Sequence, residues 1–205
     1  RHRFYHVLGN HDFDVARTLK PQVPGKVGLQ KRYDAFELGG FRFVFLDTTD
    51  VSIYAHEEGT PEHAAGEAEL QRVQAAALPQ AKPWNSGLSG LQLQWLDTQC
   101  TEAAAKGVRV IAFAHHPVAP AGGHDLWNSE AVLQLVSRHR HLAAWINGHN
   151  HAGAYAEMEG AHFVTVHGMV ETAETNAFAT AELMADRLII AGHGREPSRE
   201  LVFRV

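Results

Sequence analysis

Polar residues gather at the C-terminal ends of four apolar, strand-like runs, and this arrangement constrains the fold more than any other feature of the chain. Such runs favour β-strands because they are rich in β-branched and aromatic residues. Polar side chains at the ends of neighbouring strands can converge on one point. The runs cover residues 4–8, 108–113, 142–146 and 161–166, and they end at Gly9-Asn10-His11-Asp12, Ala114-His115-His116-Pro117, Gly148-His149-Asn150-His151 and His167-Gly168.

The residue types in these clusters are suited to a divalent metal ion. Asparagine oxygen and imidazole nitrogen bind zinc, manganese or iron, and the glycines beside them let backbone and ion approach closely. Asn10 alone would be interpreted as a turn former. His149 and His151 are two residues apart, so an extended backbone would direct both rings to the same face. Together the clusters predict a metal centre at the strand ends.

The clusters resemble the calcineurin-like metallophosphoesterases, whose later motifs read G-N-H-[DE], [GS]-H-x-P and G-H-x-H. Residues 9–12, 114–117 and 148–151 supply these motifs in the same order. The family's first motifs, D-x-H and G-D-x-x-D, lie upstream of G-N-H-D, and nothing before Gly9 provides them here. We therefore interpret residues 1–205 as a single, N-terminally truncated calcineurin-like phosphoesterase domain. The resemblance implies an α/β fold (an α+β four-layer sandwich) with two packed mixed β-sheets flanked by helices, lacking its first strands.

The same resemblance assigns roles to five residues. Asn10, His115 and His149 are expected to bind one metal ion and His151 the other. His11 is expected to point towards the phosphate and to donate a proton to the leaving oxygen. The implied cofactors are two divalent metal ions, Mn²⁺ in the first place, with Fe, Zn or Mg as alternatives. The bridging carboxylate belongs to the missing motifs, so we expect the chain as given to bind at most one metal ion weakly and to be inactive without them.

Further segments are similar to the manganese-dependent ADP-ribose/CDP-alcohol diphosphatases; they lie at residues 84–89, 126–128, 170–173, 176–178 and 192–199. This similarity implies that a metal-activated water cleaves the diphosphate bond of small nucleoside diphosphate derivatives such as ADP-ribose and CDP-alcohols. A tryptophan ring at the mouth of the site can stack on a nucleobase, or it can pack in the core. His167 could also be a metal ligand. The candidate substrate contacts are Trp84, Asn85, Trp127, Asn128 and His167.

Two other functions stay open at this point. One is a cyclic-nucleotide phosphodiesterase or generic phosphoesterase on the same scaffold. The other, from a different class, is a non-catalytic binding scaffold with the metallophosphoesterase fold. The intact G-N-H-D motif argues against the scaffold, because a protein that only binds has no need of His11.

Composition limits the partners and the compartment. With 205 residues and 45% apolar content, the chain can bury a substantial core as one domain. Its formal charge of −5 disfavours nucleic-acid binding, and its apolar runs are too short to span a membrane. We expect a small-molecule nucleotide substrate, no nucleic acid and no membrane; the oligomeric state is left open. The single cysteine, Cys100, favours the cytoplasm, although a signal peptide upstream of Arg1 would mean secretion.

Three further residues are expected to be structural. Asp47 follows the strand-like run 41–46, and the family resemblance implies that it closes this strand and supports structure near the site. Cys100 falls at helical spacing with leucines and is expected to be a packed thiol. His116 follows His115 directly, so in an extended strand its side chain would point the other way.

Local signals predict the remaining elements. Residues 89–92 form a capping box, which predicts a helix that ends at Gly107. A helix is expected around residues 67–77 and another from residue 129 to about 141. Strands are expected at residues 41–46, 108–113, 161–166, 178–184 and 187–191, with a hairpin turn at Ala185-Asp186 between the last two.

Overall fold

The computed structural model describes residues 4–204 of the chain. Strands and helices alternate up to β4, and strands alone follow. The short turns of helix near the N-terminus are η1 (Asn10–Phe13), η2 (Arg17–Gln22) and α1 (Val23–Lys26). The longer helices are α2 (Pro61–Ala75), α3 (Gly90–Lys106) and α4 (Ser129–Arg138). The strands are β1 (Asp34–Leu38), β2 (Phe41–Phe45), β3 (Arg109–Phe113), β4 (Leu142–Asn147), β5 (Ala154–Met158), β6 (Ala161–Thr165), β7 (Ala177–Leu183), β8 (Arg187–Gly194) and β9 (Arg199–Val202).

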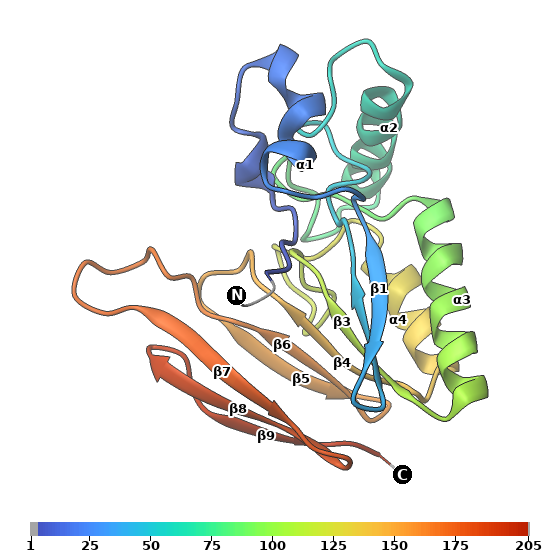
Figure 1. Cartoon of the computed structure of the whole chain (residues 1–205). Helices are drawn as coiled ribbons and strands as arrows, with labels where there is room; N and C mark the ends of the chain where they lie inside the picture. Colours follow the sequence, from blue (N-terminus) through green and yellow to red (C-terminus); the bar gives the residue numbers. More distant parts are fainter. Residues whose placement is uncertain (1–3, 205) are drawn as a thin grey trace.

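The strands form two sheets that lie one against the other (Figure 1). The larger sheet has six strands in the order β1-β2-β3-β4-β6-β5, and β2, β3, β4 and β6 run parallel at its centre. The smaller sheet is antiparallel, in the order β7-β8-β9. Because the four central strands are parallel, the loops that follow them emerge at the same edge.

Two hydrophobic cores separate three layers. The first core lies between the larger sheet and helices α3 and α4, with Leu96, Val132 and Trp145 among its buried members. The second lies between the two sheets, where Ile111 of β3 packs with Ile190 of β8. The fold class is confirmed: two packed sheets with helices. In two details the expectation was wrong: the second sheet is purely antiparallel, and no helix among residues 4–204 covers its outer face (Figure 1).

Helix α3 begins and ends where the sequence predicts. The Ser89 hydroxyl accepts a hydrogen bond from the backbone N–H of Gln92 (3.2 Å), and Gly107 ends the helix in the left-handed region at φ 69°. The second half of the capping box is different. The Gln92 side chain bonds the backbone of Asp47 in both directions, at 2.9 Å each, and the Asp50 carboxylate accepts from the Ser89 N–H instead. The cap therefore also anchors the loop that follows β2.

Several predicted boundaries differ from the structure. Helix α2 begins at Pro61, six residues earlier than expected, because Thr60 caps it and proline suits the first turn. Helix α4 ends at Arg138, since His139 leaves helical geometry and its ring bonds Asp97 at 2.7 Å. Strands β1, β5 and β9 were not predicted. The hairpin turn at Ala185-Asp186 is confirmed, with Met184 N–H donating to the Arg187 carbonyl (2.8 Å).

The predicted strand at residues 4–8 is wrong, because these residues belong to no β-ladder in the part of the chain that is described. Side-chain packing holds the segment instead: the Tyr5 ring stacks on Phe36 and Phe45, with centroid distances of 4.7 and 4.9 Å. Phe4 stays 81% exposed.

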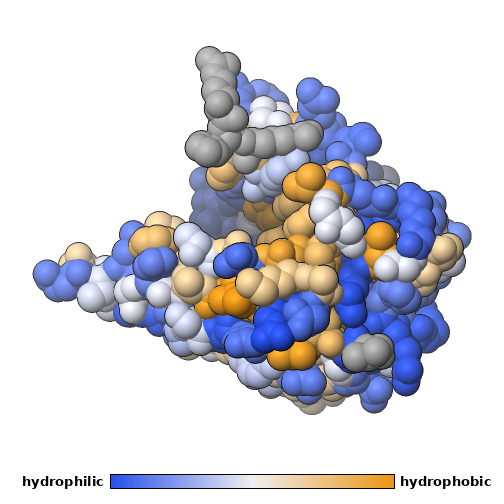
Figure 2. Space-filling model, turned by 60° about the horizontal axis from the view of Figure 1, so that its bottom comes forward, coloured by the Kyte–Doolittle hydropathy of each residue, from blue (hydrophilic) through white to orange (hydrophobic). Residues whose placement is uncertain are grey.

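Figure 2 shows that apolar residues gather in a hollow at the centre of one face, bordered by hydrophilic residues.

None of the helices within residues 4–204 has the length and apolar character needed to cross a bilayer.

Candidate metal centre

The loops after three neighbouring parallel strands are bonded to one another. Strands β2, β3 and β4 end in register, with Phe45 opposite Phe113 and Phe113 opposite Ile146. Just beyond, the Thr48 hydroxyl accepts from the His115 N–H (3.3 Å), and the Gly148 N–H donates to the His115 carbonyl (3.1 Å). These bonds fix the two histidine-bearing loops side by side.

Three side-chain atoms converge between these loops and the turn after residue 8. Nε2 of His115 lies 3.0 Å from Oδ1 of Asn10 and 3.1 Å from Nδ1 of His149. Two ligands that are each about 2.1 Å from an ion, at a right angle, would be about 3 Å apart. The three atoms therefore fit one divalent ion of the kind that binds oxygen and imidazole nitrogen. That they bind a metal stays a prediction.

Close packing at Gly9 positions the His115 ring. A Cβ atom on Gly9 would lie 2.7 Å from Cε1 of that ring, so only glycine lets the chain pass there. Asn10 follows at the start of η1. The glycine of the G-N-H-D cluster thus explains how Asn10 and His115 come together.

Burial keeps the clustered imidazoles neutral, which is the form that binds metal. Desolvation is the main reason that the pKa of His115 falls to about 4, and desolvation together with the neighbouring histidines lowers the pKa of His149 to about 2. Burial also lowers the pKa of His116 well below its usual value. Within residues 4–204, these three histidines form the group whose ligand atoms all lie within 4.8 Å of one another, and it contains no carboxylate.

The metal-free protein should lose stability in mild acid. In the unfolded chain each of the three histidines takes up a proton as the pH falls through its ordinary value of 6.5, whereas in the native state it stays neutral. Each such proton lowers the free energy of unfolding by about 1.4 kcal/mol per pH unit. Burial raises the pKa of Asp125 to about 6, so this carboxyl takes up one proton in the native state before it does so in the unfolded chain. That proton raises the free energy of unfolding as the pH falls and offsets part of the loss.

Urea unfolding at several pH values from 7 to 5 measures this slope. The variant His149→Asn lacks one of the three protons and should show a slope smaller by about 1.4 kcal/mol per pH unit. Equal slopes for the variant and the native chain would contradict the low pKa of His149.

The G-H-x-H segment does not have the extended backbone assumed from the sequence. Strand β4 ends at Asn147, and His149 adopts φ 66°, in the left-handed region. His149 therefore turns into the cluster, while His151 lies on the wall of the same cavity, outside the cluster. Nδ1 of His151 contacts the Glu171 carboxylate, which leaves Nε2 as the nitrogen for a metal ion.

His11 lines the cavity without touching the clustered atoms. The cavity has a volume of about 530 Å³ and is bordered by Asn10, His11, Trp84, His115, His124, His149, Asn150, His151 and Ala152. His11 is exposed, and its Nδ1 lies 2.7 Å from the Asp14 carboxylate, a partner that the sequence analysis missed although it is only three residues away. Asp12 closes the turn by accepting from the Gly9 N–H (2.9 Å) and contacts His6 (3.1 Å).

The candidate substrate contacts separate into two groups. Trp84 is 46% exposed and borders the cavity, where its ring is available. Trp127 is 1% exposed, and its indole N–H donates to the Lys82 carbonyl, so it packs in the core. The Asn128 side chain bonds the backbone of Leu88 in both directions rather than facing the cavity.

Asn85 is fully buried and touches His149, with Oδ1 2.8 Å from Nε2. His124 is not among the candidate residues of the sequence analysis, yet it borders the cavity, with its ring centroid 5.6 Å from that of His149. Nothing in the local sequence distinguishes His124 from the other histidines.

His167 is held by a buried carboxylate instead of lining the cavity. Oε2 of Glu196 accepts from the His167 backbone N–H (2.7 Å) and contacts its Nδ1 (2.9 Å). Glu196 is 4% exposed and also pairs with Arg199. The sequence analysis missed Glu196, which arrives from the loop between β8 and β9.

Asp47, Cys100 and His116 are all buried. Asp47 pairs with Arg32 and accepts from the Thr49 N–H (3.0 Å), so it supports the loop as expected. The expected direction of His116 is wrong: β3 ends at Phe113, the chain bends, and the His116 ring lies 4.1 Å from that of His149.

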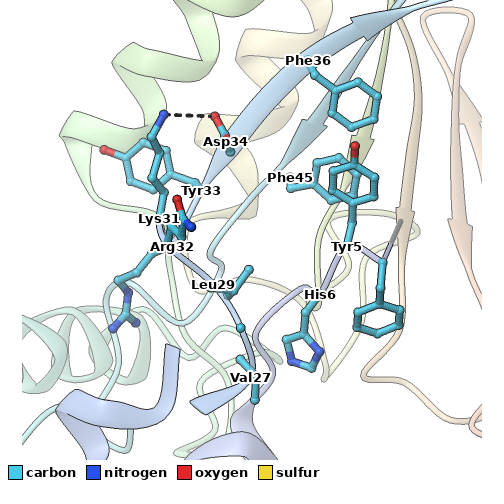
Figure 3. A pocket seen from close by; sticks show the side chains of 13 residues that line it. Tyr5, His6, Val27, Leu29, Lys31, Arg32, Tyr33, Asp34, Phe36 and Phe45 are labelled. Carbon is cyan, nitrogen blue, oxygen red and sulfur yellow. Dashed lines mark hydrogen bonds and ion pairs between the residues drawn. The ribbon is translucent and has the colours of Figure 1, made fainter. Parts of the chain in front are cut away.

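A second cavity, of about 610 Å³, shares no lining residue with the first. Figure 3 shows Tyr5, Phe36 and Phe45 along one side of it and Lys31, paired with Asp34, on the other. None of the site residues predicted from the sequence borders this cavity.

Comparison with known proteins agrees with the geometry. Residues 1–153 match the family model described as calcineurin-like phosphoesterase. A Danio rerio protein named manganese-dependent ADP-ribose/CDP-alcohol diphosphatase is 34% identical over 93% of this chain and 69% of its own length. The Homo sapiens protein of the same name is 28% identical over 80% of this chain, a match that spans 52% of the human protein. The crystal structure of a dimetal phosphatase from Danio rerio superimposes with a TM-score of 0.87 and 30% identity, covering 98% of this chain and 72% of that one.

Proposed function

This chain belongs to the calcineurin-like phosphoesterase family, and from that premise we propose that it is a metal-dependent phosphohydrolase that cleaves the diphosphate bond of small nucleoside diphosphate derivatives. The observation that carries the proposal is that His115 Nε2 lies about 3 Å from both Asn10 Oδ1 and His149 Nδ1 on the wall of a cavity.

Five of the residues that border the cavity have a proposed task. Asn10, His115 and His149 hold one divalent ion, and His151 contributes to a second. Two such ions together lower the pKa of a water and offset the charge of the transferring phosphoryl group. His11 donates a proton to the leaving oxygen, and Asp14 holds the opposite side of its ring at 2.7 Å.

The substrate class rests on the relatives and on one exposed ring. The Danio rerio and Homo sapiens relatives are named for ADP-ribose and CDP-alcohols. Trp84 borders the cavity and can stack on a nucleobase. We therefore propose ADP-ribose and CDP-choline as substrates, with Mn²⁺ as the metal and the cytoplasm as the compartment.

A cyclic-nucleotide phosphodiesterase or generic phosphoesterase is the alternative. It would use the same metal cluster, so only the substrate distinguishes it.

In a protein that carries this chain together with the upstream D-x-H and G-D-x-x-D motifs, hydrolysis of ADP-ribose and CDP-choline should depend entirely on added Mn²⁺. The assay compares these substrates with 2′,3′-cyclic AMP and bis(p-nitrophenyl) phosphate, in the presence of Mn²⁺, Mg²⁺ or EDTA. The metal ions of the site can be removed by a chelator. EDTA should therefore reduce turnover to background, and Mn²⁺ should restore it. Full activity after exhaustive chelation would contradict the proposal, and activity confined to the cyclic nucleotide would favour the alternative.

A further inference from the structure

We propose that Asn85 is a positioning residue, which fixes the tautomer and the orientation of His149 so that Nδ1 faces the metal. Asn85 is fully buried, and its Oδ1 lies 2.8 Å from Nε2 of His149. On the other side of the same ring, Nδ1 faces His115 at 3.1 Å. The proposal rests on the metal role of His149 proposed above.

The orientation of the Asn85 amide follows from its other partners. Its Nδ2 lies 2.9 Å from the Gln80 carbonyl and 2.9 Å from the Gly123 carbonyl. Carbonyl oxygens only accept hydrogen bonds, so the amide nitrogen must face them and Oδ1 must face His149. An oxygen in that place accepts, so Nε2 of His149 must carry the proton. Nδ1 is then left as a lone pair directed into the cluster.

The loop that carries Asn85 is itself held rigidly. The backbone N–H of Asn85 donates to the Lys82 carbonyl (3.1 Å). The carbonyl of the next residue, Ser86, accepts from the backbone N–H of Trp127 (2.7 Å). The Trp127 indole donates to the Lys82 carbonyl at 3.1 Å. This explains why Trp127 is buried although Trp84, in the same neighbourhood, is exposed: Trp127 supports the loop.

His149 needs such support because its own backbone is in a costly conformation. A φ of 66° is unusual for a residue with a side chain and persists only where the surroundings enforce it. Metal-binding histidines commonly donate their other N–H to an oxygen, and loss of that partner typically reduces metal affinity about 10–100-fold. Asn85 supplies that oxygen.

The test begins with the metal-free 205-residue chain, in which long-range ¹H–¹⁵N NMR of the imidazoles identifies the tautomer of His149. We expect a single Nε2–H tautomer at pH 7 in the native chain and a mixture in Asn85→Ala. Asn85→Asp keeps an oxygen towards His149 and should keep the Nε2–H form. An Nδ1–H tautomer in the native chain, or the same tautomer in Asn85→Ala, would overturn the proposal.

The second measurement is Mn²⁺ affinity, followed by the EPR signal of the free ion. Asn85→Ala should bind about 10–100-fold more weakly. Gln92→Ala is the matched control, because Gln92 is also a fully buried amide bonded to backbone groups, yet it touches no histidine of the cluster. It should lose stability but keep its affinity within about threefold. Equal affinity losses in the two variants would reduce Asn85 to a general structural role and refute the proposal.

Neither readout needs turnover. If a protein that carries this chain together with the upstream D-x-H and G-D-x-x-D motifs hydrolyses no diphosphate while the tautomer and affinity behave as expected, the proposed function fails and the role of Asn85 stands. If it hydrolyses ADP-ribose and Asn85→Ala leaves the tautomer and the affinity unchanged, the role of Asn85 fails alone.

Discussion

Replacing His149 by alanine is expected to abolish metal binding and hydrolysis together. The site offers three neutral donor atoms, with His115 Nε2 3.0 Å from Asn10 Oδ1 and 3.1 Å from His149 Nδ1, and the histidine group within residues 4–204 contains no carboxylate. With His149 removed, only Asn10 and His115 remain, and an amide oxygen is a weak ligand. The affinity for Mn²⁺ should fall by more than about 100-fold, the upper range for losing an outer partner alone. In a protein that also carries the upstream D-x-H and G-D-x-x-D motifs, turnover should fall to the level of the chelated protein.

His139→Ala provides the control for this prediction. His139 lies before β4, at the opposite edge of the sheet from the cluster, and its ring bonds Asp97. Removing it costs the hydrogen bond to Asp97 and leaves the cavity intact, so metal affinity and turnover should stay near the native values. Native Mn²⁺ affinity in His149→Ala, measured with the same titration, would contradict the proposed metal centre.

His11→Ala is expected to keep the metal and to lose turnover. The His11 ring borders the cavity but lies outside the clustered donor atoms, and Asp14 contacts its Nδ1. General acid catalysis by such a group typically contributes about 10²–10⁴-fold, so kcat should fall within that range. The loss should be larger for substrates with poor leaving groups, because these depend most on a proton donor.

Comparing His11→Ala with His149→Ala separates the two roles. Both variants are made in a protein that carries the upstream D-x-H and G-D-x-x-D motifs, and metal stoichiometry and kcat are measured with ADP-ribose and with an activated p-nitrophenyl ester. His56→Ala serves as a control, since the His56 ring bonds the Asp50 carbonyl and takes no part in the cavity. If His11→Ala loses metal as completely as His149→Ala, the division between proton donor and metal ligand is wrong.

The class of fold could be predicted from local patterns because strand ends, caps and glycines act on their immediate neighbours. The run before His115 and the run before His149 became β3 and β4, and Ser89 and Gly107 delimit α3 as expected. The edge strand β1 was missed because its residues, Asp34–Leu38, are mostly exposed or half-exposed and lack an apolar run. The segment at residues 4–8 looked like a strand, but a strand also needs a partner, and here the Tyr5 ring stacks on Phe36 and Phe45 instead.

The sequence by itself determined which residue types are available to bind a metal ion. Asn10, His115 and His149 follow strand-like runs in the order of a known family, and each motif can be recognised from its immediate neighbours. Tertiary structure decided how these side chains are oriented and supported. Asn85 meets His149 across 64 residues and Glu196 meets His167 across 29, and no pattern of spacing encodes either contact. Both histidines follow parallel strands, whereas Asn85 comes from the segment between α2 and α3 and Glu196 from the loop between β8 and β9. A partner's oxygen therefore determines which histidine nitrogen carries the proton only after these separate parts have packed together.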